Sequence, residues 1–183
     1  MKETEMERIF LVKELPEDLE DFRHIIIKVG DFFDSNSIDA LKIKQKGDKY
    51  ALIKKEGESA LKRTEHTIFI KKGEFDILWK CTTQKHEKIR YYYNIGSYTC
   101  EIDIYQGKLL GYVRAEIEFN DPEEMKSFEP PSWFGEEITV WNHDIHENLG
   151  TVTFAEMEER YLGKGISLKN ISIIKTDNHI ISL

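Results

Sequence analysis

Cysteine is scarce in this 183-residue chain, and its two cysteines, Cys81 and Cys100, form no Cys-x-x-Cys pair. We therefore expect neither a disulfide framework nor a zinc site, and a reducing cytoplasm suits such a chain. No apolar run approaches the ~20 residues that cross a membrane. The acidic start of the chain also lacks the apolar core of a signal peptide. The sequence thus predicts a cytoplasmic protein with no membrane partner.

Glycine-rich phosphate loops and nucleophile motifs are missing as well. No glycine-rich segment precedes a predicted helix, so neither a P-loop nor a Rossmann site is expected. No serine or cysteine lies in a nucleophile motif. His143 and His146, with Glu147 beside them, resemble metal ligands. They lack the His-Glu-x-x-His spacing, however, and are more typical of surface histidines.

Charge is abundant and segregated along the chain. Charged residues make up 33% of the sequence, and the net charge is −8. Residues 38–90 carry 14 basic against 8 acidic side chains, whereas residues 97–160 carry 4 against 15. The negative total would repel a nucleic-acid backbone, so no nucleic-acid partner is expected. The pattern suits a small polyanion held by the basic part, with metal ions bridging it to the acidic part.

Alternation of apolar and charged side chains is the strongest structural signal. Residues 109–119 alternate along most of their length, with Ala115 and Ile117 on one face and Glu116 and Glu118 on the other. A period of two predicts a strand. Seven more strands are predicted at residues 5–12, 24–29, 38–46, 49–55, 61–70, 87–95 and 98–105. An open sheet would put the charged faces in water and a closed barrel would put them in its lumen, and composition favours neither.

Short helices and turns are expected around these strands. Helices are predicted at residues 16–22, 73–79, from the Asp121-Pro122 start, and at 146–162. Residues 130–135 read as a rigid loop, 136–140 as an extended segment and 166–183 as a hairpin turning at Asp177-Asn178. No repeat or linker interrupts the chain, so we expect a single domain over residues 1–183.

Two pairs of carboxylates use the same spacing. Glu5 and Glu7 share one face of the first strand, as Glu116 and Glu118 share one face of the 109–119 strand. Paired carboxylates repel each other unless a cation lies between them. Two such pairs would make an oxygen-lined pocket suited to Mg²⁺ or Mn²⁺. For either pair alone, the solvent face of an ordinary sheet is the simpler interpretation.

The order of these motifs resembles the CYTH domain, the triphosphate tunnel metalloenzyme superfamily. The opening Glu5-x-Glu7-Arg8-x-Phe10-Leu11-Val12 is similar to the N-terminal signature of that family. The further matches, in family order, are Lys42-x-Lys44, Tyr50-x-Leu52 with Lys55, Arg63-x-Glu65, Lys88-x-Arg90, Glu101-x-Asp103, Glu116-x-Glu118 and Pro131-x-Trp133-Phe134-Gly135-x-Glu137-Ile138-Thr139. The resemblance covers about residues 5–160 and leaves about 161–183 as an extension. It implies a mainly β member of the α+β class, an eight-stranded antiparallel closed β-barrel, or triphosphate tunnel, with flanking helices.

The resemblance also implies a role for each charged position. The implied ligands of Mg²⁺ or Mn²⁺ are Glu5, Glu7, Glu116 and Glu118. The implied phosphate-binding residues are Lys42, Lys44, Lys55, Arg63, Lys88, Arg90 and Arg114. The implied catalytic residues are Lys88, Glu65 and Asp103, of which the two acids would position water. The alternative for the same set is an ion-pair network that only fills a barrel.

The implied function is metal-dependent hydrolysis of triphosphate compounds, with inorganic triphosphate the leading substrate. Hydrolysis of nucleoside triphosphates or thiamine triphosphate, a class IV adenylate cyclase and a non-catalytic polyphosphate or nucleotide binder stay open. A cyclase needs a purine pocket at the tunnel mouth, and the sequence does not identify one. The expected partner is tripolyphosphate or a nucleoside triphosphate, and the expected state is a monomer or a homodimer.

Three positions depart from the family pattern. Ile9 stands where the family has a lysine, and Lys42 and Lys44 stand where it has arginines. Lysine replaces a bidentate fork with a point charge, so phosphate would be held with looser geometry. Ile9 shares the parity of Glu5 and Glu7, which predicts an apolar side chain in the lumen and weaker triphosphate binding than in relatives. Trp133, in the loop of residues 130–135, is expected to pack against the protein rather than to stack on a base or on thiamine.

Overall fold

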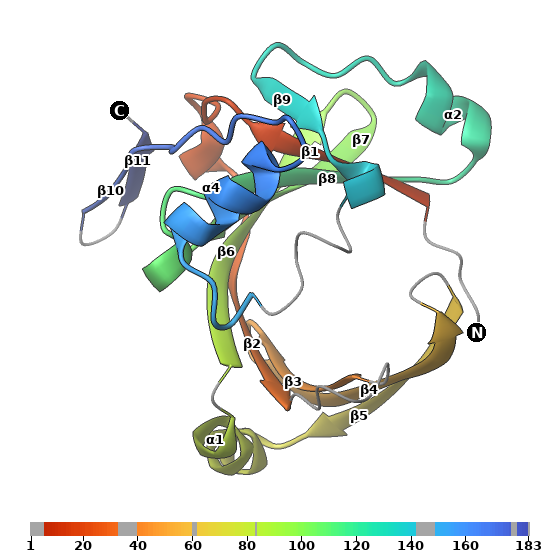
Figure 1. Ribbon diagram of the computed structural model, residues 1–183, viewed down its shortest axis with the longest axis vertical. Coiled ribbons are helices and arrows are strands. Elements are labelled where there is room, and N and C mark those ends of the chain that lie inside the picture. The colour runs from red at the N-terminus through yellow and green to blue at the C-terminus, as the bar shows by residue number, and fades with distance from the viewer. Residues whose placement is uncertain are drawn as a thin grey trace.

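The alternating segments form one strongly curved antiparallel sheet in the computed structural model (Figure 1). The structure describes residues 6–32, 40–59, 62–82, 84–141, 149–176 and 179–182. The strands of this sheet are β1 (Met6–Val12), β2 (His24–Phe32), β3 (Ala40–Lys46), β4 (Lys49–Ser59), β5 (Lys62–Ile70), β6 (Gln84–Ile95), β7 (Tyr98–Tyr105), β8 (Val113–Phe119) and β9 (Phe134–Glu137). Hydrogen bonds place them in the order β5-β4-β3-β2-β6-β7-β8-β1-β9.

The sheet bends so far that β3, β4 and β5 lie across a ring from β1 and β8 (Figure 1). The mainly β antiparallel fold is therefore confirmed. The predicted strands are present, and β9 adds a further strand beside β1. β5 and β9 are the ends of the hydrogen-bonded order, and within the described residues no ladder joins them. Closure into a barrel thus stays a prediction.

Helical elements cover the sheet at several points. They are η1 (Leu19–Asp21), α1 (Lys72–Cys81), η2 (Gly107–Leu109), α2 (Pro122–Ser127), η3 (Thr139–Trp141) and α4 (Phe154–Leu162). The carboxylate of Asp121 accepts hydrogen bonds from the amides of Glu123 and Glu124, which caps α2 as the Asp-Pro start predicts. Thr153 and Glu156 form a capping box that starts α4.

Several predicted elements differ from the structure in type or boundary. The helix predicted at residues 16–22 is only the 3-10 turn η1, and the extended segment predicted at 136–140 ends with β9 at Glu137, before η3. The strand predicted from residue 109 begins only at Val113, because a 3-10 turn precedes it. Gly111 has a φ of +97°, a left-handed conformation that glycine adopts readily and that interrupts an extended strand. The helix predicted over residues 146–162 begins at Phe154, and residues 142–148 lie outside the described part. The predicted final hairpin is present as a separate sheet of β10 (Ile173–Thr176) and β11 (His179–Ser182).

Two apolar cores lie on opposite faces of the sheet. Phe10 points into the first, where residues from β6, β7 and β8 pack under Phe128 and Phe134. Its neighbour Ile9 points into the second, with Tyr105 and with Met157 of α4. Burying a large apolar side chain contributes about 1.5–3 kcal/mol, so both cores stabilise the curvature. The segment that contains α4 therefore covers part of the face that carries Ile9.

Smaller predictions concern residues away from the charged face. Cys81 is exposed, Cys100 is buried and both are free thiols, as expected. Trp133 packs edge-on against Tyr93 and Phe134, which is the packing role predicted for it. In the part of the chain that the structure describes, no helix is long and apolar enough to cross a membrane.

Candidate active site

The register of β6, β7 and β8 brings predicted charged residues to one face. Arg90 on β6 faces Asp103 on β7, and Asp103 faces Arg114 on β8. In the next row, Glu101 faces Glu116. Directly opposed residues in an antiparallel ladder point to the same side, and residues two apart on a strand do so as well. All five side chains therefore share one face of the sheet.

The same face continues across β2, β3 and β4. Lys88 faces Ile27 of β2, and two positions further along β2 Val29 faces Lys44 of β3. The opposite side of β3 and β4 is the outer one, because α1 covers it there, with the rings of Phe75 and Tyr50 packed at a tilt and 5.2 Å apart between centroids. The charged face is thus the inner face of the ring in Figure 1.

Backbone register adds three predicted positions to this inner face. Lys55 of β4 faces Ala40 of β3, which lies two residues before Lys42. Glu65 of β5 faces Lys55, and Arg63 lies two residues before Glu65. The predicted positions from β3 to β8 therefore form neighbouring rows on one face.

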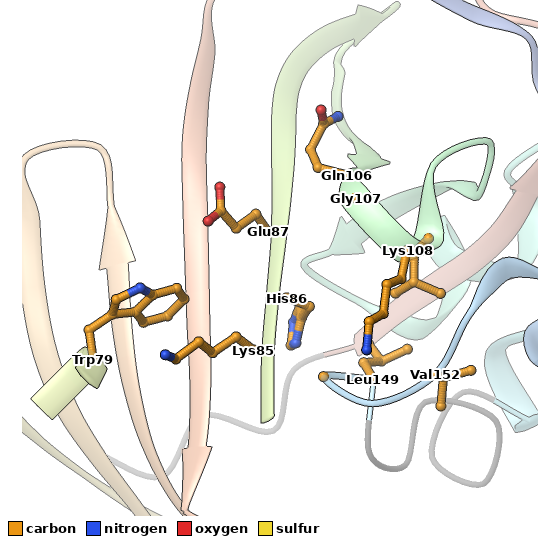
Figure 2. A pocket seen from close by; sticks show the side chains of 11 residues that line it. Trp79, Lys85, His86, Glu87, Gln106, Gly107, Lys108, Leu149 and Val152 are labelled. Carbon is orange, nitrogen blue, oxygen red and sulfur yellow. The ribbon is translucent and has the colours of Figure 1, made fainter. Parts of the chain in front are cut away.

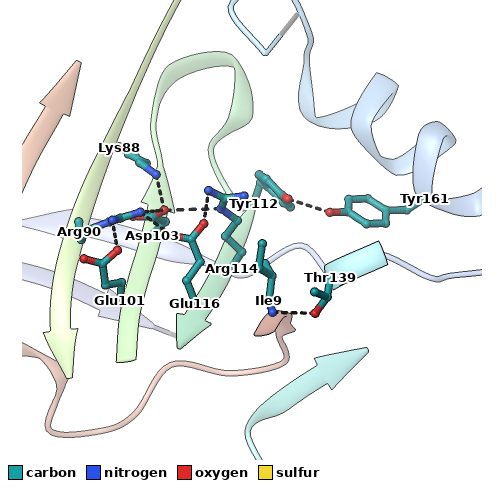
Figure 3. A network of polar contacts seen from close by, with 10 residues as sticks. All are labelled: Ile9, Lys88, Arg90, Glu101, Asp103, Tyr112, Arg114, Glu116, Thr139 and Tyr161. Carbon is teal, nitrogen blue, oxygen red and sulfur yellow. Dashed lines mark hydrogen bonds and ion pairs between the residues drawn. The ribbon is translucent and has the colours of Figure 1, made fainter. Parts of the chain in front are cut away.

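Asp103 is the centre of a buried ionic network (Figure 3). Its carboxylate is 0% exposed and accepts hydrogen bonds from Nε and Nη2 of Arg90 at 2.6 and 2.7 Å. Lys88 Nζ also donates to this carboxylate, and Arg114 Nε lies 3.5 Å from it. Hydrogen bonds between charged groups are strong, so this carboxylate fixes the positions of the three cations around it.

The guanidinium groups extend the network to the next row of carboxylates. Arg90 Nη2 lies 2.7 Å from Glu116 Oε2, and Nη1 of the same guanidinium contacts Glu101. Arg114 also contacts Glu116. Two carboxylates that face each other across the ladder thus have a cation between them, which relieves their repulsion.

Burial and these ion pairs shift the pKa values of the network in opposite directions. Burial alone would raise the pKa of Asp103, but Lys88, Arg90 and Arg114 outweigh it and hold that pKa well below its usual range. Burial lowers the pKa of Lys88 to about 8, although Asp103 acts to raise it. For Arg90, the hydrogen bond and charge of Asp103 outweigh burial and raise the pKa. Asp103 and Arg90 therefore stay ionised at neutral pH.

The lysines of β3 have a more open setting. Lys42 Nζ lies 3.4 Å from Asp31 on β2, and both side chains are partly exposed. Lys44 is half-buried on the same face. An ion pair of this kind is worth about 0–1 kcal/mol, so an incoming anion can displace it at little cost.

The predicted metal ligands are partly within the described structure. Glu7 of β1 faces Glu118 of β8, and Glu116 lies in the row next to them, whereas Glu5 lies outside the described residues. Among the residues that are described, no three acidic, histidine or cysteine side chains converge as a preformed metal cluster. Like charges that face each other destabilise a sheet unless a cation lies between them. The oxygen-only donor set and its position on the inner face fit Mg²⁺ or Mn²⁺ in chemistry.

Ile9 lies at the boundary between the charged and apolar parts of the inner face. It faces Glu116 across the ladder, which confirms the predicted parity of β1. Its side chain is only 1% exposed, because Leu11, Ile138 and the α4 segment pack around it. Its amide donates to Thr139 Oγ1 at 3.0 Å. The position of the expected lysine is therefore part of the second core rather than open lumen.

Sequence reasoning missed Tyr105 and His86. Tyr105 follows Asp103 by two residues on β7, and its ring lies 5.6 Å from Lys88 Nζ and 5.9 Å from Arg114 Cζ. His86 precedes Lys88 by two residues on β6. The period of two that identified Lys88 and Asp103 extends to both residues, so the strand pattern contained the signal that would have found them.

Comparison with known proteins finds two curated relatives. The chain is 32% identical over 138 residues to an inorganic triphosphatase of Nitrosomonas europaea, a match that covers 74% of this chain and 89% of the relative. It is 31% identical over 120 residues to an inorganic triphosphatase of Acetivibrio thermocellus, which covers 64% of this chain and 74% of the relative. No protein-family model matches the chain.

Solved structures are similar over most of the chain. The crystal structure of the inorganic triphosphatase NE1496 has a TM-score of 0.65 at 28% identity and covers 81% of this chain and 94% of that protein. A second crystal structure of NE1496 has a TM-score of 0.68 at 28% identity and covers 82% and 99%.

Proposed function

Because this chain belongs to the CYTH, or triphosphate tunnel metalloenzyme, superfamily, we propose that it is a divalent-metal-dependent hydrolase whose substrate is inorganic tripolyphosphate. One observation carries this proposal. Lys88, Arg90 and Arg114 converge on the inner face beside carboxylates of the type that hold Mg²⁺ or Mn²⁺. The names of the two curated relatives support the same reaction.

Tripolyphosphate binding exchanges internal ion pairs for substrate contacts. A pair of opposite charges 4 Å apart is worth about 4 kcal/mol at an effective dielectric constant of 20. In this proposal Lys42, Lys44, Lys88, Arg90 and Arg114 hold the phosphate chain, together with Lys55 and Arg63. Lys42 gives up its weak pair with Asp31, and the buried Arg90 keeps Asp103 as its anchor.

Three residues have the catalytic roles. Asp103 is held ionised, so in this proposal it orients Lys88 against the phosphate rather than accepting a proton. Glu65 positions the attacking water. The water oxygen bonds to a terminal phosphorus, the bond from that phosphorus to its bridging oxygen breaks, and the electron pair stays on the departing pyrophosphate. One water proton passes to solvent, and the other stays on the second product, orthophosphate.

Family membership implies a divalent metal cofactor, and we propose Mg²⁺ or Mn²⁺. Glu5, Glu7, Glu116 and Glu118 would hold it. When bound, such an ion neutralises phosphate oxygens and favours attack on phosphorus. Glu116 would then exchange contacts with Arg90 and Arg114 for contacts with the ion.

The proposal also covers the closure of the sheet, the oligomeric state and the compartment of the enzyme. In solution the sheet closes into a tunnel around the substrate, and the whole chain acts as one domain. The enzyme works in the cytoplasm as a monomer or homodimer. Ile9 in place of the family lysine makes triphosphate binding weaker than in relatives, while the remaining cations still support turnover.

Phosphate release tests the proposed function. Purified protein is incubated with tripolyphosphate or pyrophosphate in Mg²⁺, in Mn²⁺ or in EDTA. We expect release from tripolyphosphate with either metal, little release in EDTA and slower release from pyrophosphate, which reaches fewer of the cations. Tripolyphosphate that binds but is not hydrolysed with any metal would identify a non-catalytic binder instead.

A further inference from the structure

Tyr105 lies beside two cations of the ionic network, and the proposed reaction gives it no role. It faces Lys88 across the β6–β7 ladder, and directly opposed residues in such a ladder have Cβ atoms about 4.5–5.5 Å apart. The ring of Tyr105 lies 5.6 Å from Lys88 Nζ and 5.9 Å from Arg114 Cζ. Both distances are within the ~6 Å over which an aromatic ring attracts a cation. One aromatic side chain is thus in reach of both cations.

The second core holds the ring of Tyr105 in place. The side chain is 1% exposed and belongs to the apolar cluster that contains Ile9. Its ring centroid lies 4.8 Å from that of Tyr112, and the hydroxyl of Tyr112 shares a hydrogen bond of 2.8 Å with Tyr161 of α4 (Figure 3). The amide of Tyr105 also donates to the carbonyl of Tyr112 at 3.1 Å. Close packing of this kind leaves a buried ring little room to move, so Tyr105 offers the cations a fixed surface.

Asp103 alone does not fix the orientation of Lys88. A lysine ammonium is a compact charge at the end of a flexible four-carbon chain, and its three donors rotate. The ion pair with Asp103 fixes one point of this side chain, and the ring of Tyr105 supplies a second. Two points of contact define an orientation, whereas one point leaves the ammonium free to turn.

The ring contact also survives the exchange that metal binding requires. In the proposed function, Glu116 gives up its contact with Arg114 when it binds the metal ion. Burial raises the pKa of Tyr105 well above its usual range, so its hydroxyl stays protonated at neutral pH. A protonated phenol is a poor ligand for Mg²⁺, which prefers carboxylates and water. The ring therefore stays with Arg114 while the carboxylate leaves.

We propose that the aromatic face of Tyr105 is a positioning element that orients Lys88 and Arg114 toward the phosphoryl group under attack. The inference rests on the proposed triphosphatase function and deepens it. Tyr105 acts through the two cations, touches no substrate atom and transfers no proton. Other lysines and arginines of the inner face also hold the phosphate chain, so loss of the ring should impair the catalytic step more than substrate binding.

Two substitutions separate the effect on kcat from the effect on KM. Tyr105→Leu removes the ring, and Tyr105→Phe keeps the ring without the hydroxyl. We expect Tyr105→Leu to lose about 10–100-fold in kcat for tripolyphosphate with KM within about threefold of the wild type. Tyr105→Phe should keep nearly the wild-type kcat. Tyr91→Leu is the matched control, because Tyr91 is 2% exposed but lies in the first core, on the other face of the sheet. It should lower Tm to a similar extent and leave kcat unchanged.

Fluorinated rings change the charge distribution of this side chain and nearly keep its shape. Pentafluorophenylalanine in place of Tyr105 removes the negative potential of the ring face, which is what attracts cations. Relative to Tyr105→Phe, it should lose about tenfold in kcat, and a trifluorinated ring should give an intermediate value. A side chain that only fills the core would give the same kcat with all three rings, and that result would overturn the proposal. If Tyr105→Leu does not fold, this series decides the question.

The outcomes separate failure of this inference from failure of the proposed function. A loss of kcat in Tyr105→Leu that Tyr91→Leu reproduces, or no loss in Tyr105→Leu, would overturn the role of Tyr105 and leave the triphosphatase in place. A loss in Tyr105→Phe equal to that in Tyr105→Leu would assign the role to the hydroxyl and overturn it too.

Absence of tripolyphosphate turnover in the wild type with every metal would overturn the proposed function. The proton NMR signal of the Lys88 ammonium, assigned with Lys88→Arg and recorded below the Lys88 pKa of about 8, then tests whether the ring holds Lys88. A ring-current shift present in the wild type and in Tyr105→Phe and lost in Tyr105→Leu would support the contact. Equal signals in all three proteins would overturn it.

Discussion

Replacing Asp103 with asparagine removes the central charge of the ionic network and nearly preserves its shape. In the Asp103→Asn variant, Lys88, Arg90 and Arg114 remain beside a neutral amide. Their mutual repulsion is then no longer balanced at the centre. We expect a protein that folds with lower stability and that gains more from a bound polyanion than the wild type does.

The size of the effect follows from burial. Asp103 is fully buried, and removing one partner of a buried ion pair costs about 3–5 kcal/mol. For a domain of this length each kcal/mol shifts Tm by about 2–4 °C, so we expect Tm to fall by about 6–20 °C. Asparagine still accepts one hydrogen bond from Arg90, which favours the lower half of this range.

Asp31→Asn is the matched control. Asp31 pairs with Lys42 at 3.4 Å on the same face, but both side chains are partly exposed. A pair of this kind contributes about 0–1 kcal/mol, so Tm should fall by no more than about 4 °C. Thermal unfolding of the wild type and both variants is recorded with and without tripolyphosphate. The rise in Tm on adding tripolyphosphate should be larger for Asp103→Asn than for the wild type.

Two results would refute this reasoning. If Asp103→Asn unfolds no earlier than Asp31→Asn, Asp103 is not the anchor of the three cations. If tripolyphosphate stabilises Asp103→Asn less than the wild type, those cations are not where the polyanion binds.

Further predictions concern pH, metal and the second core. The folded pKa of His86 is about 3, below the value of ~6.5 in the unfolded chain, so stability present above pH 6.5 is lost as pH falls toward 3, by up to ~1.4 kcal/mol per unit. Chemical denaturation at pH 7, 6, 5 and 4 should therefore give a steeper loss for the wild type than for His86→Gln, and parallel losses would count against a neutral, buried imidazole. Glu7→Gln with Glu118→Gln should lower kcat for tripolyphosphate by at least ~10–100-fold with little change in Tm, and unchanged turnover would place the metal elsewhere. Ile9→Lys should lower Tm well below Ile9→Met, because it buries an ammonium in the second core, and should tighten the tripolyphosphate Kd by about ten- to hundredfold. If Ile9→Lys binds no more tightly than Ile9→Met, the charge at this position does not reach the phosphates.

The period-two pattern predicted the strands and their charged faces because the alternation of apolar and charged side chains is a local property of each strand. Lys88 and Arg90, for example, are assigned to one face of β6 by parity alone, and the register to β7 then places Arg90 opposite Asp103. The strand start predicted at residue 109 was wrong. The turn at Gly111 depends on its backbone conformation, which the alternation of apolar residues does not reveal.

Features built from distant segments were beyond the sequence pattern. A pocket of about 500 Å³ at the start of β6 is lined by Trp79 of α1, His86 of β6 and Leu149 (Figure 2). No local period in the sequence links these three residues. Burial of Ile9 depends likewise on Met157 of α4, which packs on the inner face from far along the sequence. Parity correctly gave the direction of Ile9, but only the packing of the later segment decides what it meets.

The most direct test of the central claim compares two arginines on opposite faces of the sheet. Arg90 binds carboxylates on the inner face, whereas Arg8 of β1 lies on the outer face, with its Nε and Nη2 at 3.2 and 2.7 Å from Glu137. The measurement is kcat/KM for tripolyphosphate in Arg90→Ala and Arg8→Ala, at a temperature where both variants are folded. If the inner face is the triphosphatase site, Arg90→Ala loses about 100-fold or more and Arg8→Ala stays within a few-fold of the wild type. Equal losses in the two variants, or a larger loss in Arg8→Ala, would contradict the account.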